Sequence, residues 1–122
     1  MAKKSVPRDL PTEKNVSAFD MLQPLVHNLA DELRELSKKK QDGILNELKV
    51  KMTNRLLSQV KVILANEETH QFLDLLDNES LPTNSDVVLI LSQYEGAMEA
   101  FKEKYYGWDG IAHRWFTQER PA

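Results

Sequence analysis

The sequence contains no cysteine in its 122 residues. This absence excludes disulfide bonds, thiolate metal ligands and cysteine nucleophiles together, so the fold must be stabilised by packing. Glycine is also scarce, with four residues in the whole sequence, and there is neither a glycine-rich phosphate loop nor a GxSxG motif. We therefore expect neither phosphate-loop chemistry nor covalent catalysis of these kinds.

A long apolar run is missing as well. The longest is VVLIL, residues 87–91, far short of the roughly 20 residues that a membrane-spanning helix needs. The N-terminal stretch MAKKSVPRDLPTEKN has two lysines near its start and no apolar segment after them, which is not the pattern of a secretory signal. We therefore expect a cytoplasmic protein without a membrane-embedded part.

The composition that remains is typical of a globular protein: 41% of the residues are hydrophobic and 29% are charged, over a length that fits one domain. The net charge is −3, but its distribution is uneven. Residues 38–61 hold seven basic and two acidic side chains, whereas residues 62–101 hold eight acidic side chains and no lysine or arginine. Such polarity favours self-association or a charged partner.

Apolar residues recur at helical spacing in three long segments, approximately 17–40, 43–65 and 83–107. A shorter helix is indicated over residues 66–77, and the proline-containing connector 78–84 follows it. No segment shows the alternation of a β-strand. The sequence therefore predicts an all-α fold, an antiparallel bundle of three long helices and one short helix.

Three regions are expected along the chain. Residues 1–15 carry two prolines and no apolar periodicity, which predicts a flexible N-terminal arm. Residues 16–107 form the helical bundle domain. Residues 108–122 form an aromatic C-terminal extension, which follows from the stretch YYGWDGIAHRWF at residues 105–116, where five of the nine aromatic residues lie.

The predicted helix over residues 43–65 has an unusually wide apolar face. Beside its first stripe, a second set of Val50, Leu57 and Leu64 repeats at seven-residue intervals. Together the two sets cover roughly 200° of the helix surface, twice the minimum width of a core-facing stripe. The helix must therefore be covered from two directions, which predicts a homodimer or another protein partner.

These observations favour a non-enzymatic interaction or regulatory module that acts through the second helix and the aromatic segment. Large rings are common anchors of interfaces as well as of cores, so the aromatic segment covers either its own bundle or a partner. The residues predicted to bind a partner are Val50, Leu57, Leu64, Trp108, Ile111, Arg114, Trp115 and Phe116.

A nucleic-acid-associated protein is the first alternative, because basic residues cluster at the end of the first helix and along the second. No recognition-helix or aromatic-stacking motif accompanies them, and the sequence pI is near 5.6. The residues that would contact a phosphate backbone are Lys38, Lys39, Lys40, Lys51, Arg55 and Lys61.

An enzyme is the least favoured alternative. The carboxylate pairs Glu32/Glu35 and Asp74/Asp77 are three residues apart, and they resemble in part the magnesium site of all-α nucleoside triphosphate pyrophosphatases. The stretch NELKVKMTNR, where that family has further glutamate pairs, offers only Glu47. The three histidines, His27, His70 and His113, fall in different predicted elements. We therefore expect no catalytic residues, no metal and no cofactor.

Overall fold

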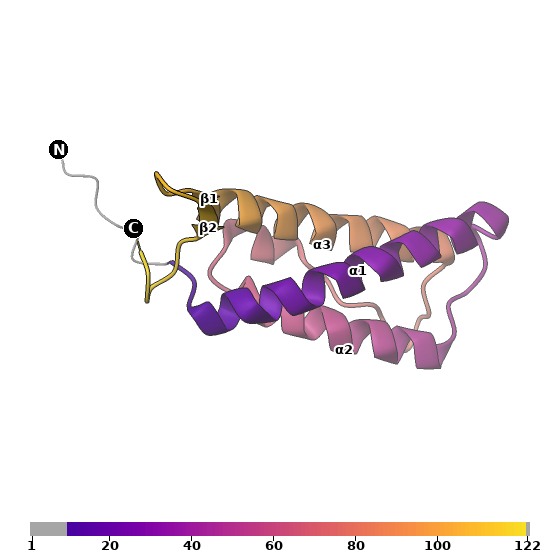
Figure 1. The fold of residues 1–122 in the computed structure, drawn as a ribbon. Helices are drawn as coiled ribbons and strands as arrows, with labels where there is room; N and C mark the ends of the chain where they lie inside the picture. The colour runs from indigo at the N-terminus through magenta and orange to yellow at the C-terminus, as the bar shows by residue number, and fades with distance from the viewer. Residues whose placement is uncertain (1–9, 122) are drawn as a thin grey trace.

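The computed structural model describes residues 10–121, which form a helical bundle with a short hairpin at one end (Figure 1). The predicted bundle is confirmed for three long helices, but the structure is not purely α-helical. Its elements in chain order are α1 (Glu13–Lys39), α2 (Glu47–Ile63), the 3-10 helix η1 (Glu68–Phe72), α3 (Asn84–Tyr105), β1 (Tyr106–Trp108) and β2 (His113–Trp115).

Helix α1 begins inside the predicted N-terminal arm. Thr12 is its N-cap, and the Thr12 hydroxyl accepts a hydrogen bond from the backbone N–H of Asn15 at 3.1 Å. Leu10 is buried, and the Gln118 side chain donates to its carbonyl at 2.8 Å. Residues 10–12 are thus held by the C-terminal segment, a contact that local sequence patterns do not reveal. Residues 1–9 of the predicted arm lie outside the described residues.

One apolar core is shared by all three long helices, and the most extensive contact is between α1 and α3. Phe19 of α1 and Phe101 of α3 stack with their ring centroids 5.2 Å apart, and both are almost completely buried. Toward the surface, Arg34 of α1 forms an ion pair with Glu95 of α3, and Nδ1 of His27 lies 3.2 Å from the same carboxylate. The two helices are therefore joined by an apolar centre and a polar margin.

The prediction of a short α-helix over residues 66–77 is wrong. Only the 3-10 helix η1 forms there, and the chain then runs extended past α2. Side chains of the long helices satisfy its backbone: Asn54 donates to the carbonyl of Leu76 and accepts from its N–H, both at 2.8 Å, and Lys61 donates to the carbonyl of Leu73 at 2.8 Å. These tertiary hydrogen bonds replace those of a helix, while Leu73 and Leu76 remain buried.

Residues 106–115, which overlap the predicted aromatic extension, form an antiparallel hairpin, and residues 116–121 follow it without helix or strand. Tyr106 pairs with Trp115, and Trp108 pairs with His113. In the turn, Gly110 has φ of 102°, a conformation that glycine adopts without strain. Among residues 10–121, none of the helices has the length and apolar character that crossing a bilayer requires.

Candidate functional site: an apolar groove between α1 and α2

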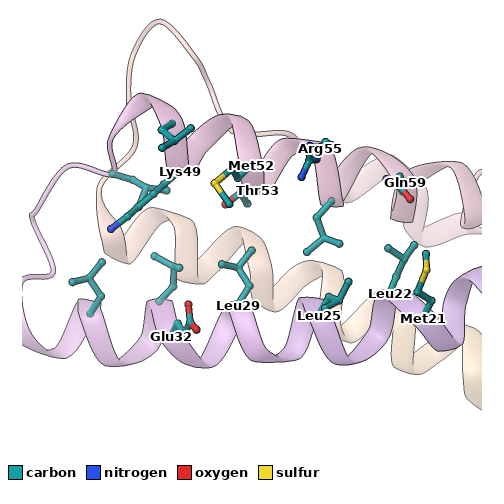
Figure 2. Close-up of a pocket in the computed structure, with 15 residues that line it drawn as sticks. Met21, Leu22, Leu25, Leu29, Glu32, Lys49, Met52, Thr53, Arg55 and Gln59 are labelled. Carbon is teal, nitrogen blue, oxygen red and sulfur yellow. The ribbon is translucent and has the colours of Figure 1, made fainter.

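An open groove runs between α1 and α2 on the side of the bundle away from α3 (Figure 2). Its volume is about 840 Å³. On α1 it extends from Met21 to Leu36, a length of about 22 Å at the rise of an α-helix. The groove is lined by Met21, Leu22, Leu25, Leu29, Glu32, Leu33 and Leu36 of α1, and by Leu45, Leu48, Lys49, Met52, Thr53, Arg55, Leu56 and Gln59 on or just before α2.

The apolar walls of this groove are open to solvent. Met21 and Leu25 on α1 are 56% and 49% exposed, and Leu48 and Met52 on α2 are 66% and 56% exposed. Figure 2 shows Leu25 and Met52 projecting from opposite helices toward the space between them. Because monomeric proteins rarely leave a large contiguous apolar surface uncovered, this groove is the main candidate for a binding site.

Three charged side chains belong to the same surface. Glu32 comes from α1, and Lys49 and Arg55 come from α2. Within the described part of the chain, none of the three forms an ion pair. The α1 wall of the groove therefore presents a negative charge and the α2 wall presents positive charges.

Sequence reasoning identified the wide apolar face of α2 but chose its wrong side for a partner. Val50, Leu57 and Leu64 are all fully buried inside the bundle. They face the core, so a partner cannot reach them in this fold. The open side of the same helix carries Leu48 and Met52, which were not among the residues predicted to bind a partner.

The aromatic segment divides between core and surface. Trp115 packs against Phe19 and Phe101, with ring centroids 5.2 and 5.9 Å away, and Phe116 is also partly buried against the core. Trp108 and Ile111, in contrast, are 59% and 85% exposed. Of the predicted aromatic anchors, Trp115 and Phe116 cover their own bundle, and only the hairpin tip remains open.

Arg114 is occupied by contacts within the hairpin. Its Nε donates to Oδ2 of Asp109 at 2.8 Å, and its Nη1 donates to the carbonyls of Trp115 and Arg120 at 2.8 and 2.9 Å. Its guanidinium carbon lies 4.5 Å from the centroid of the Phe116 ring. Arg114 therefore fastens the C-terminal segment, and this use competes with its predicted role toward a partner.

Half of the basic residues predicted for nucleic-acid contact form an ion pair or a hydrogen bond with another part of the same chain. Lys38 pairs with Glu35 at 3.1 Å, and Lys51 pairs with Glu47 at 3.3 Å. Lys61 donates to a backbone carbonyl of the extended segment. Lys39, Lys40 and Arg55 are exposed. Such exposed pairs are weak, but they reduce the positive charge that α1 and α2 offer to a phosphate backbone.

The predicted carboxylate pairs lie in separate surroundings. Glu35 pairs with Lys38, whereas Asp77 accepts hydrogen bonds from the backbone N–H groups of Glu79 and Ser80, and these lower the pKa of Asp77. In residues 10–121, no three histidine, aspartate or glutamate side chains come together in a way that could hold a metal ion.

The chain matches no known family model, no curated protein and no solved structure in the comparisons made. The groove is therefore interpreted from its own residues. The sequence did not identify four lining residues as partner-binding, namely Met21, Leu25, Glu32 and Lys49. The signal that could have identified the groove is that α1, like α2, carries apolar residues outside the set that is buried in the core.

Proposed function

We propose that this chain is a non-enzymatic protein-interaction module whose binding surface is the groove between α1 and α2. The observation that carries the proposal is the exposure of apolar side chains on both walls of one continuous groove. A helix of the partner would lie along the groove with one apolar stripe inserted between the walls, which is a common way for proteins to recognise helices.

The dimensions of the groove support this kind of partner. A length of about 22 Å corresponds to about four turns of an α-helix. The two methionines, Met21 and Met52, supply flexible side chains that adapt to the shape of an inserted residue. Glu32, Lys49 and Arg55 lie where they can select a partner by its charge.

Site-specific photo-crosslinking in the native cell tests this function. A photoreactive amino acid replaces Met52 in the groove in one variant and Leu89 on α3 in a matched control, since Leu89 is exposed to a similar extent at 62%. We expect protein adducts from position 52 and not from position 89. No adduct from position 52, or equal adducts from both positions, would contradict the proposal.

A further inference from the structure

We propose that the occupant of the groove is a second copy of this chain, so that α1 and α2 of two subunits form a four-helix interface. This inference rests on the proposed function and names its partner. Fifteen residues line the groove, and a standard protein interface uses roughly 20 to 30 residues on each side. A second copy would bury both walls and the residues that flank them.

The charges on the groove of one subunit are complementary to those on the groove of a second copy. The negative side chain, Glu32, is on α1, and the positive side chains, Lys49 and Arg55, are on α2. A two-fold axis parallel to the helices places α1 of each subunit on α2 of the other. Each negative wall then meets a positive wall, and symmetry makes the match twice.

The positions of Glu32 and Lys49 along the helix axes agree with this arrangement. Figure 2 shows Glu32 on α1 opposite the part of α2 that carries Lys49 and Met52. Rotation about an axis parallel to the helices leaves the position of each residue along that axis unchanged. Glu32 therefore faces Lys49 of the partner subunit, a pair that would be partly screened from solvent by the apolar walls.

The remaining surface does not oppose association. The net charge of −3 is small, so the repulsion between two copies is weak. Because both helices are intact in the single chain, dimerisation requires no unfolding of either subunit. The exposed side chains of Met21, Leu25, Leu48 and Met52 would become buried at the interface.

Sedimentation equilibrium of the full chain over a range of concentrations measures the mass of the particle. We expect twice the monomer mass of 14.1 kDa for the natural sequence. Met52→Asp and Leu25→Asp should raise the dissociation constant by at least about tenfold, because each places a charge in the apolar interface. Leu89→Asp, on α3, should leave the dissociation constant unchanged. Melting curves check that every variant is folded.

An exchange of charges tests the arrangement of the subunits. Glu32→Lys alone and Lys49→Glu alone should each weaken the dimer, since each makes two like-charged contacts. An equimolar mixture of the two variants should form a heterodimer in which both contacts are again opposite in sign. Failure of the mixture to associate better than either variant alone would overturn this arrangement.

Two results would overturn the proposal that a second copy occupies the groove. One is a natural chain that stays monomeric at every concentration, and the other is Met52→Asp that dimerises as well as Leu89→Asp. Photo-crosslinking separates this failure from that of the proposed function. Adducts from position 52 that contain only other proteins would retain the groove as a binding site and reject the second copy as its occupant.

Discussion

Asp109 organises the turn of the C-terminal hairpin with a single carboxylate. Its Oδ1 accepts hydrogen bonds from the backbone N–H groups of Ile111 and Ala112, both at 2.8 Å, and its Oδ2 accepts from Arg114. The bonds from Ala112 and Ile111, followed by the one from Arg114, lower the pKa of Asp109 to about 2. The ionised form is thus the one that the folded turn stabilises.

This lowered pKa predicts how the hairpin responds to acid. The pKa of an aspartate in an unfolded chain is about 3.9. The stabilisation is therefore fully present above that value and is lost as the pH falls toward about 2. We expect the NMR signals of the Trp108 indole to shift with this titration, and Asp109→Asn to abolish the shift. A midpoint near pH 4 in the natural chain would contradict the interpretation.

Residue-scale predictions from the sequence were best for the core and weakest for polar side chains. Leu22, Val26 and Leu33, for example, lie at helical spacing in the predicted helix over residues 17–40, and all three are buried. The role of Asn54 in holding the extended segment was not predictable, because both hydrogen bonds join it to Leu76, 22 positions away in the chain. Local patterns carry no information on contacts of this kind.

At the scale of the elements, the hairpin attaches to the bundle through one of its two tryptophans. Trp115 lies against Phe19 and Phe101, whereas Trp108 at the other end of the strand pair is mostly exposed. Between them, Tyr106 contacts both Trp115 and His113, so the rings form a continuous row from the core to the hairpin tip.

Alanine substitution of the two tryptophans should separate these roles. Trp115→Ala leaves a cavity beside Phe19 and Phe101, so we expect it to lower the free energy of unfolding by about 3 kcal/mol. Trp108→Ala removes a largely exposed ring and should change that free energy by no more than about 0.5 kcal/mol. Urea denaturation measures both values. Equal losses for the two variants would show that the hairpin tip is as important to the fold as its base.

The element boundaries illustrate what periodicity can predict. The long helices were found because three- and four-residue spacing persists over many turns, and the connector predicted around Pro82 is non-helical in the structure. The short helix was mistaken because Phe72, Leu73, Leu75 and Leu76 satisfy helical spacing only over a single turn. In the structure Leu73 and Leu76 are buried, while Phe72 and Leu75 are exposed.

At the scale of the whole molecule, the second copy makes thermal stability depend on concentration. A partner that binds only the folded state stabilises it by mass action. We therefore expect the Tm of the natural chain to rise with protein concentration, whereas the Tm of Met52→Asp should stay constant. Differential scanning calorimetry at several concentrations measures both. A natural chain whose Tm is independent of concentration would contradict the dimer.

The sequence by itself determined the number and position of the long helices, most of the core and the presence of more apolar surface on α2 than one neighbour covers. Spacing along a helix specifies the angle of each residue about the helix axis. It does not specify which neighbour lies at that angle. Only the tertiary structure could therefore decide that Leu57 faces α2's own bundle, that Met52 faces the open groove, and that Trp115 closes the core.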